Sequence, residues 1–209
     1  MEYICGKHSD QIDCQTLLVR RQAYAQLWLD IGTGDGRFVE QVAKTHSDTL
    51  IVGLDACREN LVRVSKRALP NTLFVIANAE KLPLELTGLA DLITINFPWG
   101  SLLEGLLVAN SSVISNLQMV ARPMACVEIR LNESALLAAG WTLEDGCAQL
   151  KRVLQSNGFE VGLAHQPTKA ILQSFPSTWA KRLGSGASSS ALFLTAIYKL
   201  EDVVQGISA

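Results

Sequence analysis

Glycines and carboxylates, two kinds of residue suited to ligand binding, meet at one junction near the N-terminus. Residues 29–36 read LDIGTGDG and continue an apolar, strand-like run. Glycines at a strand-to-helix turn let a ligand approach the backbone and leave helix N–H groups open to it. The G-x-G-x-G spacing differs from the G-x-G-x-x-G of dinucleotide binders, and the lysine of a P-loop is missing. Asp30 and Asp35 repel phosphate, so they favour a ligand with a cationic amino group.

Three later loops carry residues that fit the rest of such a ligand. Asp55 ends the second strand-like run, where a carboxylate can accept hydrogen bonds from both hydroxyls of a ribose. Residues 78–80 (NAE) and 96–100 (NFPWG) end the next two runs. Ligands bind at the carboxyl ends of parallel strands, so we expect Ala79 and Glu80 beside a purine and 96–99 beside the reacting group. The set favours S-adenosylmethionine (SAM), and hence a methyltransferase over a dehydrogenase.

Strand-like and helical segments alternate along the chain, which predicts βαβ units. We expect strands at 27–31, 50–54, 72–77, 90–95, 126–131, 161–165 and 191–200. We expect helices at 15–26, 37–44, 59–69, 111–120 and 143–157, with Asp13 capping the first and Gly158 ending the last. The prediction is an α/β, Rossmann-like fold with a mostly parallel, seven-stranded sheet whose last strand is antiparallel.

The chain of 209 residues is long enough for one domain or at most two. We expect residues 27–200 to form a SAM-dependent methyltransferase domain, with insertions at about 131–146 and 166–190 on the substrate side. Residues 1–26 are expected to be an N-terminal extension, a hairpin or a helix, that packs on this core. Residues 201–209 are expected to be a C-terminal tail.

Composition indicates a folded protein in a reducing compartment. Hydrophobic residues make up 48% and charged residues 18% of the chain, which excludes a disordered protein. The apolar runs are far shorter than the ~20 residues of a membrane helix, and the first ten residues lack an apolar signal segment. Five cysteines without a C-x-x-C pair fit neither a disulfide framework nor a zinc site. We therefore expect a cytoplasmic protein with no membrane contact and no metal.

The formal net charge of −2 argues against a nucleic-acid partner unless the positive charge gathers on one face. Arg63, Lys66 and Arg67 have the i, i+3, i+4 spacing that places side chains on one side of a helix. Lys181 and Arg182 add two cations in a later loop. Together they predict a local patch that binds RNA phosphates. A solvated helix face is the alternative interpretation.

Several segments together resemble one known family. They are LDIGTGDGR, VGLDACREN, FVIANAEKLPLEL, ADLITINFPWGSLLE and STWAKRL, in order between Leu29 and Leu183. The chain is similar here to the aminoglycoside-resistance 16S rRNA (adenine-1408 N1) methyltransferases, the kanamycin and apramycin resistance enzymes. FPWG followed by LLE, and S-x-W-A-K-R-L, are the narrower of these signatures. The GTGDG loop and Asp55 occur in many SAM methyltransferases.

The resemblance implies a role for each motif. Gly32 and Gly34 would hold the methionine part of SAM, with Asp30 near its amino group. Residues implied to bind SAM are Asp30, Gly32, Gly34, Asp55, Ala79, Glu80, Asn96, Phe97, Trp99 and Ser177. Residues implied to form the target pocket are Phe97, Pro98, Trp99, Ser177 and Trp179, and Lys181 and Arg182 would face RNA phosphates. The partner would be 16S rRNA within the 30S subunit, bound by a monomer.

Two tryptophans would suit methylation of adenine N1. The base must be flipped out of its stack, and Trp99 and Trp179 could hold it by both faces. N1 of neutral adenine carries a lone pair and no proton, so the reaction needs alignment and no general base. We therefore assign no catalytic role to His8, His46 or His165.

Other functions remain open from the sequence. The chain could be a SAM methyltransferase for another RNA, such as a tRNA guanine-N7 enzyme, or for a small molecule. Asn96-Phe97-Pro98-Trp99 also resembles the N/D-P-P-aromatic signature of enzymes that methylate an amino group. A SAM-fold protein that binds ribosomes and transfers methyl groups poorly is a third possibility. Residues 184–190 (GSGASSS) lack the arginines and lysines that are frequent there in the family, none occurs between Arg130 and Lys151, and Asn96 replaces a common leucine.

Overall fold

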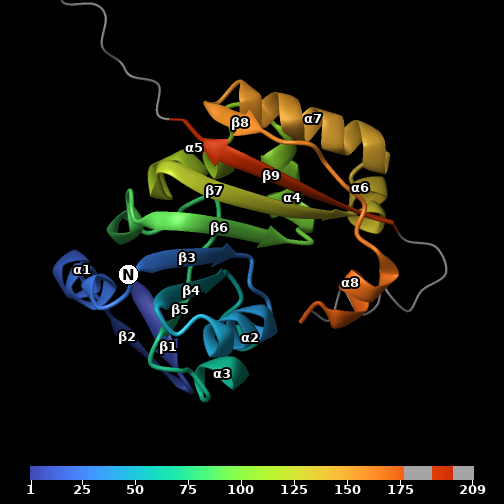
Figure 1. Ribbon diagram of the computed structural model, residues 1–209. Coiled ribbons are helices and arrows are strands. Elements are labelled where there is room, and N and C mark those ends of the chain that lie inside the picture. The colour runs from blue at the N-terminus through green and yellow to red at the C-terminus, as the bar shows by residue number, and fades with distance from the viewer. Residues whose placement is uncertain (177–189, 200–209) are drawn as a thin grey trace, which may run out of the picture.

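The computed structural model describes residues 1–176 and 190–199 of the chain. Within these residues nine strands form one sheet in the order β2-β1-β5-β4-β3-β6-β7-β9-β8 (Figure 1). In that order their bounds are His8–Gln11, Glu2–Cys5, Thr72–Ile76, Thr49–Asp55, Gln26–Ile31, Ala90–Asn96, Ala121–Asn132, Ala191–Tyr198 and Phe159–Val161. The five strands from β5 to β7 are parallel, and β9 runs antiparallel to β7. This confirms the doubly wound α/β fold and its antiparallel last strand.

The strand order reverses at β3, which pairs with β4 on one side and with β6 on the other. In doubly wound sheets, ligands bind beside the carboxyl ends of the strands at this reversal. The chain leaves β3 at Ile31 and β6 at Asn96, directly before the glycine loop and the NFPW segment. The topology therefore brings both motifs to one edge of the sheet.

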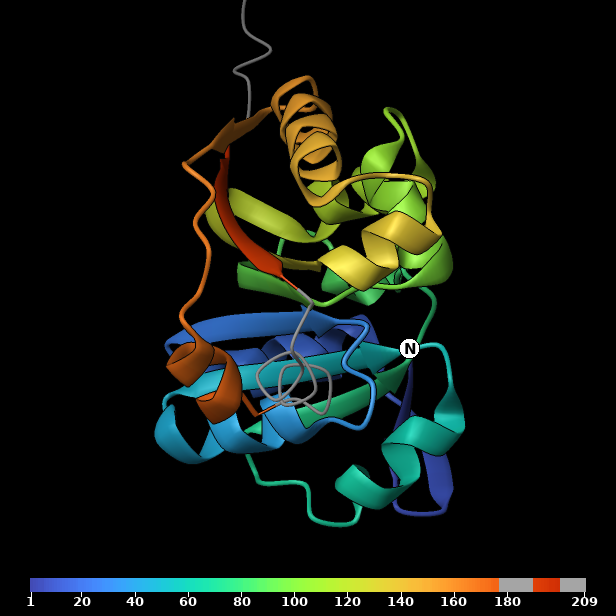
Figure 2. The same ribbon diagram turned by 90° about the vertical axis from the view of Figure 1, so that its right-hand side faces the viewer.

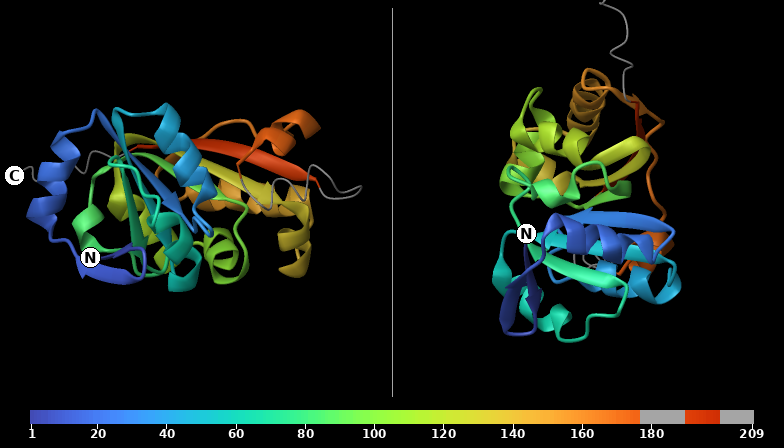
Figure 3. Two further views of the ribbon diagram at one scale, coloured as in Figure 1. Left: turned by 90° about the horizontal axis from the view of Figure 1, so that it is seen from below. Right: turned by 90° about the vertical axis from the view of Figure 1, so that its left-hand side faces the viewer.

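Two short strands raise the number from seven to nine, and they lie within residues 1–26, where the sequence predicts a hairpin or a helix. β1 and β2 form a hairpin, and β1 extends the parallel sheet by pairing antiparallel with β5. All four residues of β2 are exposed, so the hairpin has little of the apolar alternation that identifies a strand in sequence. Its turn lies beside helix α3 (Arg58–Ser65), at the end of the sheet remote from β8 (Figure 3).

Helices cover both faces of the sheet. One face packs against α2 (Arg37–Thr45) and α3. The other packs against α1 (Cys14–Gln22), α4 (Gly100–Leu107), α5 (Ser112–Val120), α6 (Glu133–Ala138) and α7 (Leu143–Gln155). The strands alternate between the two cores, so Leu27 and Leu29 of β3 face the larger core and Trp28 the smaller. The last helix, α8 (Lys169–Ser174), lies beside α2 (Figure 2).

Most predicted elements are present, with shifts at their ends. The Asp13 side chain accepts a hydrogen bond from Thr16 N at 2.7 Å and caps α1, as expected. The strand expected at 161–165 instead ends at Val161, and the chain beyond it stays beside β9 through Gly162 N, which donates to Thr195 O, and through an isolated bridge between His165 and Phe193. Helix α3 ends at Ser65 and not at 69. The sequence analysis missed α4, α6, α8 and a short 3-10 helix at Leu84–Leu86.

The helices of residues 1–176 and 190–199 are all too short or too polar to span a membrane.

Gly36 at the start of α2 shows how closely the glycine loop is packed. Its φ is +69°, and a Cβ atom there would lie 2.5 Å from Cγ1 of Val64. Gly88 has a similar φ of +65°, but its Cβ would meet no atom within 4 Å. An alanine at either position would therefore have a strained backbone, but only the alanine at position 36 would also clash with a neighbouring side chain.

We expect Gly36→Ala to destabilise the protein more than the matched Gly88→Ala. A left-handed alanine costs about 1–2 kcal/mol, and overpacking adds about 1–3 kcal/mol at Gly36 alone. Urea unfolding of both variants measures the difference. Equal losses of unfolding free energy would contradict the packing described for the loop.

Candidate functional site

A cavity of about 590 Å³ opens at the carboxyl ends of β3, β4, β5 and β6. Residues from the ends of these four strands and the loops after them line it, together with two from α4, one each from α2 and α3, and one that precedes the segment 177–189. The lining residues are Asp30, Gly32, Thr33, Gly34, Asp35, Phe38, Asp55, Ala56, Asn60, Ala77, Asn78, Ala79, Asn96, Phe97, Pro98, Trp99, Ser101, Leu102 and Pro176. The motifs that the sequence analysis singled out therefore share one cavity.

The glycine loop presents its backbone to this cavity. Gly32 and Gly34 have φ values of +73° and +57°, which glycine adopts without steric cost. The N–H groups of Gly32 and Thr33 both donate to Leu54 O, which ties the loop to the end of β4. A Cβ atom on Gly34 would meet no protein atom within 4 Å. The open space beside Gly34 leaves room for a ligand against the backbone.

Asp55 is held by three hydrogen bonds at the mouth of β4. Its Oδ2 accepts from Gly34 N at 2.7 Å, and its Oδ1 accepts from Cys57 N at 2.8 Å and from the Asn60 side chain at 3.1 Å. An ionised carboxylate has about four lone-pair positions, so one remains after these contacts. The carboxylate is thus fixed in place and still able to accept from a ligand hydroxyl.

Asp30 is a buried carboxylate with one satisfied and one unsatisfied oxygen. The residue is 1% exposed. Its Oδ1 accepts from the Thr94 hydroxyl at 2.6 Å and from the Asn96 amide at 2.8 Å. Its Oδ2 is buried and has no hydrogen-bond partner among the described residues. An unpaired buried carboxylate oxygen is costly, so it marks a position where a cationic group of a ligand would be stabilised.

Burial raises the pKa of Asp30 from 3.8 to about 6, because desolvation disfavours the charged form. The Thr94, Thr33 and Asn96 side chains and the charge of Arg130 act in the opposite direction. Trp28 lies behind this arrangement and donates from Nε1 to the Thr94 hydroxyl at 3.0 Å. That contact directs the threonine proton toward Asp30.

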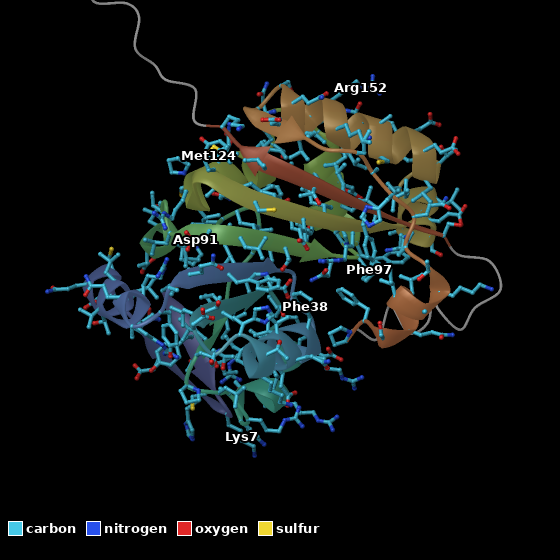
Figure 4. All side chains as sticks on the ribbon, viewed as in Figure 1. Lys7, Phe38, Asp91, Phe97, Met124 and Arg152 are labelled. Carbon is cyan, nitrogen blue, oxygen red and sulfur yellow. The ribbon has the colours of Figure 1, made fainter. Side chains whose placement is uncertain are left out.

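The NFPW segment makes a strained turn at the end of β6. Phe97 has a φ of +53°, a conformation that a phenylalanine rarely adopts, and its N–H donates to Arg130 O at 2.8 Å. The turn buries the Phe97 ring (2% exposed) and leaves Trp99 38% exposed at the start of α4. The labelled Phe97 and Phe38 lie on the side of the molecule that carries α8 (Figure 4), and both contact the Phe175 ring, with ring centres 5.7 Å and 5.2 Å away. The strained turn therefore lets the Phe97 ring be buried while the Trp99 indole, two residues later, stays accessible.

The structure brings most of the predicted site residues together. Those that line the cavity are Asp30, Gly32, Gly34, Asp55, Ala79, Asn96, Phe97, Pro98 and Trp99. Glu80 is exposed and does not line it; its N–H donates to the side chain of Asn78, which lines the cavity instead. Ser177, Trp179, Lys181 and Arg182 lie outside the described residues. Pro176, directly before them, lines the cavity.

Sequence reasoning missed several residues that shape the site. Thr94, Asn60 and Phe38 contact the predicted residues or line the cavity. Arg130, near the C-terminal end of β7, hydrogen-bonds to Asn96. A charged residue inside the apolar run 126–131 was the signal that could have identified it.

Three of the five cations predicted to bind RNA lie on or just after α3, outside the cavity lining. Arg63 is exposed on the helix, whereas Lys66 and Arg67 follow its end. Arg67 forms an ion pair with Glu40 at 2.9 Å. Part of the expected positive charge is therefore neutralised within the protein, and the role of all three stays a prediction. The described residues contain no cluster of histidine, cysteine or acidic side chains that could hold a metal ion.

Comparison with known proteins identifies the relatives of this chain. The NpmA family model, described as 16S rRNA (adenine(1408)-N(1))-methyltransferase, matches residues 2–198. The protein of that name from Escherichia coli is 34% identical over 188 residues, which cover 80% of this chain and 84% of the relative. One from Streptoalloteichus hindustanus is 41% identical over 120 residues, covering 54% and 55%.

Solved structures agree with these matches. A mutant 16S rRNA (adenine(1408)-N(1))-methyltransferase from Catenulisporales acidiphilia with cosubstrate SAM superposes with a TM-score of 0.85 at 27% identity, covering 97% of this chain and 98% of the other. The 16S rRNA methyltransferase KamB superposes with a TM-score of 0.87 at 26% identity, covering 96% and 100%. The chain therefore belongs to the 16S rRNA (adenine(1408)-N(1))-methyltransferase family.

Proposed function

We propose that this chain transfers the methyl group of SAM to N1 of the decoding-site adenine of 16S rRNA in the 30S subunit, which confers resistance to aminoglycosides. Family membership supports the target. The observation that carries the proposal is the cavity in which the unpartnered Asp30 oxygen, the glycine loop and Trp99 meet. We also propose that the protein acts in the cytoplasm as a monomer, without a metal and without a membrane.

The residues of the cavity fit SAM. The buried Asp30 Oδ2 would accept from the amino group of the methionine part, since a cation there removes the cost of an unpaired oxygen. Gly32 and Gly34 would lie along the methionine part, and Asp55 would accept from the ribose. Ala79, with Asn78 in the place expected for Glu80, would border the adenine. When bound, SAM supplies an electrophilic methyl group.

The target adenine would lie against Trp99. A base flipped out of its stack loses stacking energy, which an aromatic face replaces by about 1–3 kcal/mol. Trp99 is partly exposed at the cavity, above the buried Phe97 and Pro98. We propose that Ser177 and Trp179, which follow Pro176, complete the pocket on the other face. The N1 lone pair would attack the methyl group directly, so we propose no general base.

The contacts of Asn96 bear on the choice between N1 and an exocyclic amine as the target. An enzyme of the second kind uses the side-chain oxygen of this asparagine to accept a hydrogen from the amine. Here that oxygen accepts from Arg130 Nη1 at 2.7 Å, and the amide nitrogen donates to Asp30. One of the two lone pairs of the oxygen is thus used within the protein, and family membership supports N1.

The substrate side would comprise two segments of the chain. We propose that residues of about 131–146 and 166–190 face the rRNA, since Pro176 from the second segment lines the cavity. Lys181 and Arg182 would contact phosphates from that segment, and Arg63, Lys66 and Arg67 from the end of α3. Residues 1–26 would support the core, and residues 201–209 would form a tail.

The most direct test is expression in a susceptible bacterium. We expect resistance to kanamycin and apramycin, and a primer-extension stop at the decoding-site adenine. Trp99→Ala and Trp179→Ala should each lower methyl transfer to 30S subunits about tenfold or more, because one stacking face is lost. Both should keep the SAM affinity of the parent. Resistance without the stop, or a stop elsewhere, would contradict the proposed target.

Cofactor binding should depend on pH through Asp30. Because its pKa in the free protein is about 6, protonation should weaken SAM binding as the pH falls through that value. Asp30→Asn should bind SAM weakly, with little pH dependence in this range. Calorimetric titration across this range measures both proteins, and Asp10→Asn, which changes an exposed carboxylate of the hairpin, is the control. A wild-type affinity that does not change across this range would contradict the role of Asp30.

The stability of the free protein should change with pH in the opposite direction to SAM binding. The folded-state pKa of Asp30 lies above its ordinary value of 3.8. Its contribution to stability is therefore complete below that ordinary value and is lost as the pH rises through about 6. We expect Asp30→Asn to gain stability relative to the wild type over the same rise in pH.

Docking on the ribosome should depend on salt. We expect Arg63→Glu and Lys66→Glu to weaken 30S binding and to reduce the slope of log affinity against log salt by about 1 for each lost phosphate contact. The control is Arg152→Glu on α7. In Figure 4 Arg152 lies at the far end of the molecule from Lys7, which is in the hairpin turn beside α3. Arg67→Glu is less clean because it also leaves Glu40 without its partner. An unchanged slope in both variants would mean that α3 is a solvated face.

A further inference from the structure

Arg130 is a charged residue enclosed by aromatic rings beside the cofactor cavity. Its side chain is 14% exposed. The guanidinium carbon lies 5.0 Å from the ring centre of Phe175, 5.2 Å from that of Phe193 and 5.8 Å from that of Phe38. These rings come from the end of α8, from β9 and from α2, so three separate elements hold one side chain. Ring faces attract a cation, and more strongly when it is shielded from water.

The enclosed guanidinium is connected to Asp30 through Asn96. Arg130 lies opposite Asn96 in the parallel pairing of β7 with β6. Its Nη1 donates to Asn96 Oδ1 at 2.7 Å, and Asn96 Nδ2 donates to Asp30 Oδ1 at 2.8 Å. Arg130 Nη2 also pairs with Glu128. A cation on one side and a carboxylate on the other leave the amide a single favourable orientation.

That orientation decides which oxygen of Asp30 stays open. Asn96 and Thr94 both donate to Oδ1, and no described residue donates to Oδ2. Without Arg130 the Asn96 amide could rotate, and the carboxylate would lose a nearby positive charge. Both changes would leave Asp30 less able to present an ionised oxygen to the cavity.

We propose that Arg130 is a positioning residue that acts through Asn96 to hold the Asp30 carboxylate with one oxygen free for the amino group of SAM. The inference rests on the proposed function only in taking SAM as the ligand. Arg130 itself does not line the cavity.

A pH profile can separate this role from simple packing, because the charge of Arg130 lowers the pKa of Asp30. Asp91 bonds to Leu27 N at the opposite end of β3, and His165 contacts the outer ring of the cage, Phe193. Among the charged groups nearer to Asp30, Arg130 acts on it through its charge, Glu128 pairs with Arg130, and Asp35 and Asp55 line the same cavity. Of these, Arg130 is the cation that opposes the effect of burial on Asp30.

The test is SAM binding, measured by calorimetry as a function of pH, for Arg130→Met, Arg130→Lys and Asn96→Ala. We expect Arg130→Met to weaken SAM binding about tenfold near neutral pH. That change corresponds to the loss of one hydrogen bond that involves a charged group, here the bond from Arg130 to Asn96. The midpoint of its pH dependence should move to higher pH. Arg130→Lys, which keeps the charge, should restore the midpoint toward that of the wild type. Weaker binding with an unmoved midpoint would overturn the proposal, since a packing role alone has that effect.

Asn96→Ala tests the connection between Arg130 and Asp30 and leaves the aromatic rings around Arg130 unchanged. It therefore serves as the test if Arg130→Met fails to fold. It should also weaken binding and move the midpoint upward. When Arg130→Met is added to Asn96→Ala, it should lower the SAM affinity little further at pH values above the midpoint, because the effect of Arg130 passes through Asn96. Independent, additive losses would overturn the proposal. If the wild type itself does not bind SAM, the proposed function fails; if it binds and Asn96→Ala matches it at every pH, this inference alone fails.

Discussion

A carboxylate that is buried but only half satisfied is the constraint on which the proposed cofactor site depends. Asp30 gains two hydrogen bonds at Oδ1 and none at Oδ2 from the described residues, so the free protein carries a cost that a cationic ligand group can relieve. Trp28 supports Thr94 from one side, and Arg130 supports Asn96 from the other. Residues from three neighbouring strands therefore determine how one oxygen faces the cavity.

The sheet topology and one strained residue determine where the other groups lie. Parallel strands place the glycine loop, Asp55, Asn78 and the NFPW segment at one edge. Phe97 adopts a positive φ that its neighbours enforce through burial and the hydrogen bond to Arg130 O. Strain of this kind costs about 1–3 kcal/mol and persists where the surrounding packing holds it. It turns Trp99 toward the cavity, where an aromatic face can serve a flipped base.

Local features of the site were predictable from sequence, and contacts between distant strands were not. The glycine loop and Asp55 were recognisable because each directly follows or ends an apolar run, and the neighbouring strands β3 and β4 then bring Gly34 N to Asp55. The chain from Arg130 to Asn96 to Asp30 depends on the register of β7 against β6 and of β6 against β3, which sequence alone does not provide. Arg67 has the spacing of a docking residue, yet Glu40, on another helix, pairs with it. For residues 1–26 the sequence left a hairpin and a helix as alternatives, because the outer strand of the hairpin is exposed throughout and lacks an apolar pattern.

Carbon-13 NMR of the Asp30 carboxyl group, assigned with Asp30→Asn, would test the account most directly. In the free protein the signal should titrate near the pKa of about 6 that burial produces. On saturation with SAM the titration should move to clearly lower pH, because the bound amino group stabilises the ionised carboxylate. A titration that is the same with and without SAM would show that Asp30 does not meet the ligand, and the description of the cavity as a cofactor site would be wrong.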